Sequence, residues 1–140
     1  MTADESQISS LRANAELAIA EFRKLRGGDF GLDRGSVAWM EGYIERMRRS
    51  DSAASDGLIS VIGSYLGEAI LAAAGGVWAK HEGGDLGIKF ACGDWCFPFA
   101  KVAKQFGGGL ASGDSILSFY DVSVGYIAQG KLREAPAGAE

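Results

Sequence analysis

The sequence predicts an α+β fold in which N-terminal helices pack on a small antiparallel β-meander, followed by one or two C-terminal helices. Three observations lead to this prediction. In the first half of the chain, apolar residues recur every three or four positions, which is the spacing of a helix face. After Gly75-Gly76 the apolar residues alternate with small or polar ones, as they do in strands. Beyond Pro98 the helical spacing returns.

The first predicted helix presents one apolar face and ends before Gly27. Its start is predicted from a capping box, formed either by Thr2 with Glu5 or by Asp4 with Gln7. A second helix is predicted over residues 36–49, with Asp33 or Ser36 as its cap, and a polar linker follows it.

The third predicted helix, residues 57–74, is apolar on most sides and carries a stripe of small residues that lets another backbone approach. The wider segment 57–79 is long enough to cross a bilayer, but Glu68 lies near its middle. A charged group at that depth costs about 3 kcal/mol, whereas each Leu, Ile or Val returns only about 0.3–0.6 kcal/mol and the glycines and serines of the segment dilute them. We therefore expect a central core helix and no membrane association.

Three strands are predicted, over residues 77–81, 86–92 and 95–97, joined by turns at 83–85 and 93–94. Pro98 suits the first position of the following helix. Residues 114–127 have two interpretations: Asp114 suits the cap of a helix, whereas residues 122–126 alternate like a strand, and we favour the helix. We expect residues 1–128 to form one domain and residues 129–140 to be a flexible tail.

Composition excludes several classes of protein. The chain has 140 residues and a net charge of −4, which argues against binding along a nucleic-acid backbone. The 21 glycines have no regular spacing and only two prolines accompany them, so the chain is not collagen-like. The acidic start, Met1 to Glu5, lacks the basic and apolar segments of a secretory signal, and we expect a cytoplasmic protein.

The pair Cys92 and Cys96 is a candidate for thiol chemistry. A three-residue loop at 93–95 would place the two cysteines opposite each other, close enough for a disulfide. The alternative, which we favour, is that both are packing residues. With His81 as the single histidine and no other cysteine, we expect no metal site and no cofactor.

Glu68 is the second candidate, because a carboxylate on an apolar helix is costly to bury without a partner. It would either have a raised pKa and serve in acid–base chemistry, or bind a neighbouring backbone group, Lys80 or an arginine. We favour the second, structural interpretation.

The three tryptophans, Trp39, Trp78 and Trp95, are candidate binding residues. Trp78 and Trp95 would be anchors for a partner protein if they lay on the exposed face of the hairpins. They would be core residues if helices covered that face. Both interpretations are open.

Three short motifs occur in order: GSYLGE at residues 63–68, GGVW at 75–78 and FPFAKVAK at 97–104. This order resembles that of small bacterial domains of unknown function, over residues 58–120. The resemblance implies no catalytic residue, and by analogy it implies an immunity or accessory protein.

We therefore expect a non-enzymatic bacterial protein that binds another protein, with a homo-oligomer as a further possibility. The alternative is a small thiol-redox or hydrolytic enzyme that uses Cys92 and Cys96, or Glu68.

Overall fold

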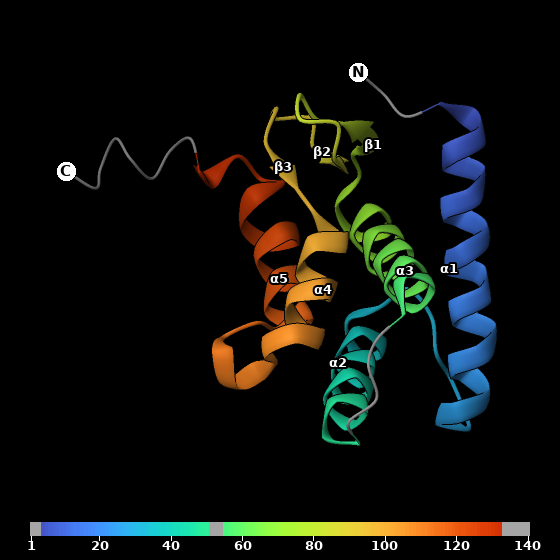
Figure 1. Ribbon diagram of the computed structural model, residues 1–140. Coiled ribbons are helices and arrows are strands. Elements are labelled where there is room, and N and C mark those ends of the chain that lie inside the picture. Colours follow the sequence, from blue (N-terminus) through green and yellow to red (C-terminus); the bar gives the residue numbers. More distant parts are fainter. Residues whose placement is uncertain (1–3, 51–54, 133–140) are drawn as a thin grey trace.

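In the computed structural model, which describes residues 4–50 and 55–132, a small antiparallel sheet lies at one end of a group of helices (Figure 1). The elements of the described residues follow in chain order. They are α1 (Glu5–Arg26), α2 (Arg34–Arg49), α3 (Asp56–Ala74), β1 (Val77–Lys80), β2 (Leu86–Lys89), β3 (Trp95–Cys96), α4 (Pro98–Gly108), a 3₁₀ turn (Leu110–Ser112), α5 (Ile116–Val122) and a π-helical turn (Ser123–Ile127). The predicted α+β class and its order of elements are confirmed.

The helix ends depend on local capping. Asp4 accepts a hydrogen bond from the Gln7 backbone N–H at 2.8 Å, and the Gln7 side chain accepts one from the Asp4 N–H at 3.3 Å. The structure thus has the second of the two predicted capping boxes. The side chains of Asp33 and Ser55 cap α2 and α3, each by accepting a hydrogen bond from the backbone N–H three residues later. At its other end, α1 stops at Gly27, which has a φ of 77°.

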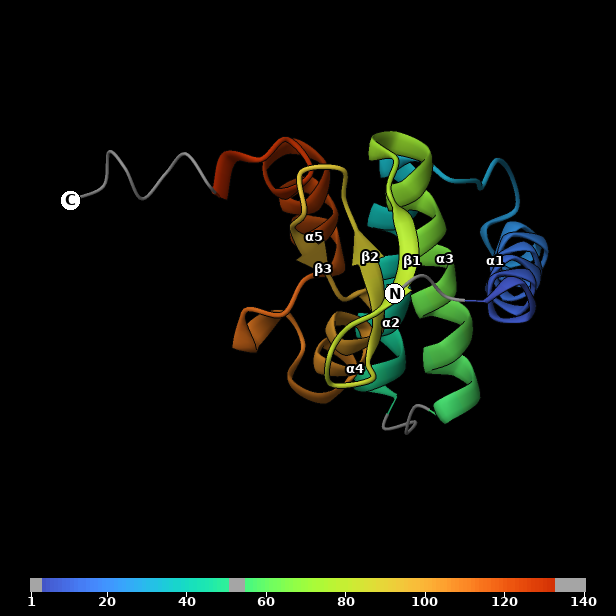
Figure 2. The same cartoon turned by 90° about the horizontal axis from the view of Figure 1, so that it is seen from above.

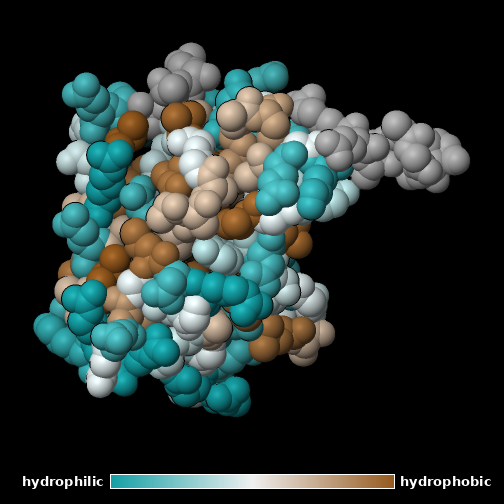
Figure 3. Space-filling view, turned by 180° about the vertical axis from the view of Figure 1, so that it is seen from behind, coloured by the Kyte–Doolittle hydropathy of each residue, from teal (hydrophilic) through white to brown (hydrophobic). Residues whose placement is uncertain are grey.

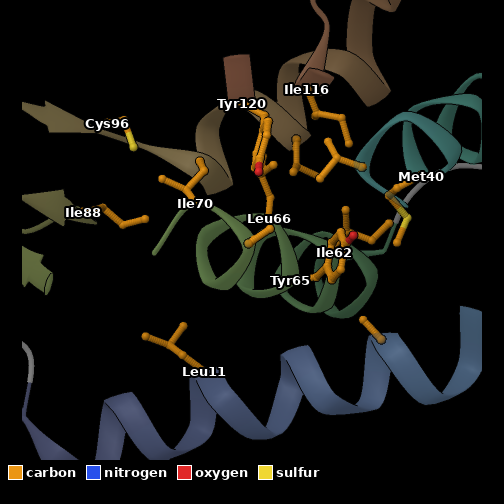
Figure 4. Packing of buried hydrophobic residues seen from close by; sticks show 14 of the residues in the cluster. Leu11, Met40, Ile62, Tyr65, Leu66, Ile70, Ile88, Cys96, Ile116 and Tyr120 are labelled. Atoms are coloured by element: carbon orange, nitrogen blue, oxygen red, sulfur yellow. The ribbon is translucent and has the colours of Figure 1, made fainter. Parts of the chain in front are cut away.

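Helix α3 forms the centre of the core, as predicted. It packs against α1 on one side and α4 on the other, and its large side chains point toward several neighbouring elements (Figure 4). Those that are fully buried include Ile62, Tyr65, Leu66 and Ile70. By length and composition alone this 19-residue helix would also be able to cross a membrane. A membrane-spanning helix and the central helix of a folded core can have the same length and the same apolar composition.

The three strands pair in the order β1-β2-β3. Trp78, Ile88 and Cys96 are opposite one another in one row, on the face that packs on the helices. The neighbouring row, Val77, Lys89 and Trp95, points to the other face. Figure 2, seen from above, shows the three strands side by side, in front of α2 and next to α3.

The predicted second strand was too long. β2 stops at Lys89, because Phe90 begins a tight turn in which its N–H donates to the Asp94 carbonyl at 2.8 Å. The β1–β2 turn has the same bond, from the His81 N–H to the Asp85 carbonyl. Each turn has a glycine with positive φ immediately before its aspartate, as expected for a three-residue hairpin loop.

The favoured helix in the last third is confirmed by α5 and the π-helical turn. Its cap is Ser115, not Asp114, and the Ser115 hydroxyl accepts from the Ser118 N–H at 3.0 Å. Of the predicted tail, residues 133–140 lie outside the described residues.

Candidate binding surface

Trp78 does not lie on the surface. Its side chain is 2% exposed, and its indole Nε1–H donates to a carboxylate oxygen of Glu68 at 2.8 Å. The ring lies against Gly67 of α3, where the glycine leaves room for it, and against Phe99 with centroids 5.8 Å apart. Of the two interpretations left open for Trp78, the core residue is correct and the exposed anchor is wrong, because α3 covers the face of β1 that carries it.

Glu68 thus has a partner that the sequence analysis did not consider. It is half-buried, and it binds an indole N–H instead of Lys80 or an arginine. A hydrogen bond of this kind stabilises a carboxylate that has lost part of its hydration. The only hint in the sequence was the short separation between Gly67-Glu68 and Trp78.

The two cysteines do not face each other, and both thiols are free. Cys96 is buried opposite Ile88, whereas Cys92 lies in the β2–β3 turn and its Sγ is 3.3 Å from the Ile127 carbonyl oxygen. The predicted loop at 93–95 was wrong, because the turn spans 90–94 and places Cys92 inside it. Burial raises the pKa of the Cys96 thiol to about 12, so this group stays protonated at neutral pH.

Trp95 is the tryptophan that stays on the outer face of the sheet, where it is half-buried. Its ring is parallel to that of Phe97, with an interplanar angle of 6° and centroids 6.0 Å apart. The His81 ring stands edge-on to both, 4.9 Å from Trp95 and 5.5 Å from Phe97. Phe97 reaches this position because Gly87 has no side chain: a Cβ there would be 2.7 Å from the ring.

Two hollows lie on either side of Phe97, and we call them together the Phe97 groove. The first has a volume of 400 Å³ and lies between β3, α4 and the C-terminal helical segment; its lining includes Trp95, Phe97, Lys101, Lys104, Phe119 and Ile127. The second has a volume of 540 Å³ and lies between α3, α4 and the β1–β2 turn; its lining includes Asp56, Ile59, Leu86, Phe97, Phe99 and Ala103. Asp85 and Ala100 border both hollows.

Trp39 belongs to a different aromatic cluster. It is half-buried on α2, stacks on Tyr43 with centroids 5.9 Å apart, and has the Arg46 guanidinium 5.4 Å above its ring. Phe22 and Phe30 contact its edge. The three predicted binding residues therefore do not form one site, and Trp95 is the one that lines the Phe97 groove.

A polar network that the sequence analysis missed joins α2 to α4 and α5. Gln105 is fully buried; its amide donates to Glu45 at 3.0 Å and accepts from the Ile116 N–H at 2.8 Å. Glu41 accepts from the Ser115 hydroxyl and from the Leu117 N–H. These carboxylates hold helices together, which is a structural role. Nowhere in the described part of the chain do three His, Cys, Asp or Glu side chains gather as they would around a metal ion.

Other exposed apolar residues are distributed over the molecule. The large hydrophobic residues that are more than one-third exposed belong to several elements: Leu17, Leu25, Leu32, Val77, Leu110, Val122 and Leu132. Figure 3 shows a diagonal band of hydrophobic residues on the face opposite to that of Figure 1. Scattered exposed side chains of this kind are normal on soluble proteins. The Phe97 groove differs because aromatic side chains, a hollow and charged groups meet there.

No protein family, curated protein or solved structure matches this chain.

Proposed function

We propose that this protein is a non-enzymatic binding module that recognises another protein through the Phe97 groove. The predicted bacterial, cytoplasmic and immunity- or accessory-like setting belongs to this proposal.

The observation that supports the proposal is the half-buried pair Trp95 and Phe97 on a sheet face that has a hollow beside it. Amphipathic aromatic residues are the commonest anchors in protein interfaces, because they lose much apolar surface and little conformational freedom on binding. His81 supports the pair from one side and Gly87 gives Phe97 its seat. The anchors are thus held in place before a partner arrives, which lowers the entropy cost of binding.

The enzymatic alternatives have less support. A thiol whose pKa is about 12 is a poor nucleophile at neutral pH, and Cys96 has no disulfide partner. Glu68 is bound to the Trp78 indole and lines neither hollow.

The test is affinity capture from the native host with three forms of the full chain: the wild type, Trp95→Ala and the control Leu25→Ala. Leu25 is a large, exposed apolar residue on α1 and has no part in the groove. We expect at least one protein to be captured by the wild type and by Leu25→Ala but lost with Trp95→Ala. Capture of the same proteins by all three forms would contradict the proposal, provided that circular dichroism shows each form to be folded.

A further inference from the structure

The Phe97 groove changes its charge from one end to the other. We propose that it binds a short segment of a partner protein that has a carboxylate at one end, an apolar side chain in the middle and a basic residue at the other end. This inference rests on the proposed function and specifies the chemistry of the partner.

The basic end is the hollow beside β3. Lys101 and Lys104 of α4 both border it, among walls that are otherwise mostly apolar. Lys101 is paired with Asp114 at 3.3 Å. Lys104 is exposed and makes no ion pair within residues 4–50 and 55–132. A partner carboxylate that enters this hollow would therefore meet an ammonium group that forms no ion pair with a carboxylate of the described residues.

The acidic end is the hollow beside α3. Asp56 comes from the first turn of α3 and Asp85 from the end of the β1–β2 turn, and no lysine or arginine of the described chain borders this hollow. Asp85 also borders the basic hollow, so it marks the boundary between the two halves. A cationic group is favoured at this end for the same electrostatic reason that a carboxylate is favoured at the other.

The middle of the groove is apolar and open. Phe97 forms a wall shared by both hollows, and Ala100 of α4 is exposed between them. Because Phe97 and Ala100 line both hollows, the two hollows are neighbours on the surface. An aliphatic or aromatic side chain of the partner would pack on Phe97 here. Volumes of 400 and 540 Å³ fall within the range of sites that bury a ligand or a large side chain.

A protruding segment fits this shape better than a second copy of the chain. Two copies that met at this face would place hollow against hollow, and their apolar walls would stay apart. A segment of a different protein would instead enter the groove and exclude water from both walls, which is what a tight interface core requires.

The test uses two small probes that share an apolar body and differ in charge: 4-phenylbutyrate and 4-phenylbutylamine. Each is titrated into the isotope-labelled full chain, and amide and indole N–H signals are followed by NMR, with dissociation constants expected in the millimolar range. We expect the carboxylate to shift the Trp95 indole and Lys104 signals. We expect the amine to shift the Asp56 and Leu86 signals.

Charge neutralisation should affect one probe at a time. Lys104→Gln should weaken binding of the carboxylate about two- to fivefold and leave the amine unchanged, and Asp56→Asn should do the reverse. Lys24→Gln and Asp29→Asn are matched controls, because both residues are exposed and lie outside the groove. Each control should leave both probes as in the wild type.

Three results would overturn the inference: both probes shift the same end, neither shifts the groove, or the controls act as strongly as the groove variants. Light scattering that shows a dimer lost in Lys104→Gln would also overturn it, in favour of a second copy as the occupant. A failure of the proposed function is recognised separately, because that function depends on capture that requires Trp95 and not on the charge preference of the probes.

Discussion

At the scale of single residues, the contact between Gly67 and Trp78 determines how the sheet sits on the helices. The indole ring occupies the space where a Cβ of residue 67 would be, and its N–H is bound to the adjacent residue, Glu68. The ring is thus held by two consecutive residues of α3. It cannot move aside without losing this part-buried hydrogen bond.

We therefore expect Gly67→Ala to lower the free energy of unfolding by about 1–3 kcal/mol, the usual cost of overpacking a core. The matched control is Gly107→Ala, also in a helix, where no atom lies within 4 Å of the added methyl group. That control should stabilise the protein by about 0.5–1 kcal/mol, because alanine is the better helix former. Urea denaturation of the three proteins measures both changes. Equal effects at positions 67 and 107 would show that the indole is not held in place.

At the scale of elements, the C-terminal helices are joined to α2 through Gln105. This side chain is fully buried, and it connects Glu45 of α2 with the first backbone N–H of α5. A buried amide that forms hydrogen bonds to two helices at once fixes both their orientation and the distance between them.

We expect Gln105→Leu, which keeps the volume of the side chain, to lower the free energy of unfolding by about 2 kcal/mol, because the Ile116 N–H and Glu45 lose a partner. Gln129→Leu is the control: Gln129 is exposed and its single bond, to the Val124 carbonyl, is long at 3.4 Å. Its replacement should change stability by less than about 0.5 kcal/mol. Thermal unfolding followed by circular dichroism distinguishes the two. If Gln105→Leu is as stable as the wild type, the network has no net stabilising role.

The helix boundaries were predictable because their signals are local. Asp4, Asp33 and Pro98 each act on the backbone of the same turn, and the structure places a helix start at each of them. The end of β2 was not predictable from the alternation of Leu86 to Cys92, because the bond from Phe90 to Asp94 replaces the strand pairing there.

The candidate site was predictable only in part, for a similar reason. The pleat of the sheet puts Trp78 and Trp95 on opposite faces, but which face is covered depends on where α3 packs. Gln105 gave no signal, since its partners are 60 and 11 residues away in the chain.

At the scale of the whole molecule, burial of one thiol and two tyrosine hydroxyl groups makes the free energy of unfolding depend on pH. The Cys96 thiol has an ordinary pKa of 9.0 when unfolded and about 12 in the fold, with burial as the main cause. Above pH 9 the unfolded chain releases this proton while the folded chain keeps it, so rising pH favours unfolding. Burial also raises the pKa of Tyr65 and Tyr120, which adds to the same trend above pH 10.

We expect the free energy of unfolding of the wild type to fall as pH rises from 9 toward 12. Cys96→Val, which keeps an apolar side chain at this position, should remove the larger part of the decline between pH 9 and 10, because the ordinary pKa of the thiol, 9.0, lies below the ordinary pKa of the tyrosines, 10.0. Urea denaturation at a series of pH values measures the slopes. Between pH 6 and 7 the two proteins should have the same slope, which serves as the control. An unchanged slope between pH 9 and 10 in the variant would contradict the assignment to Cys96.

The π-helical turn at Ser123–Ile127 changes the direction in which the following residues point from the helix axis. A π turn contains one residue more than an α turn, so everything after it is rotated by about 100° compared with a regular helix. Ile127 contributes its side chain to the basic hollow and its carbonyl to the Cys92 thiol from that rotated position. Deleting a single residue from the turn would restore the regular winding and turn Ile127 away from both. The place of Ile127 in the groove thus depends on one extra residue in this helical segment.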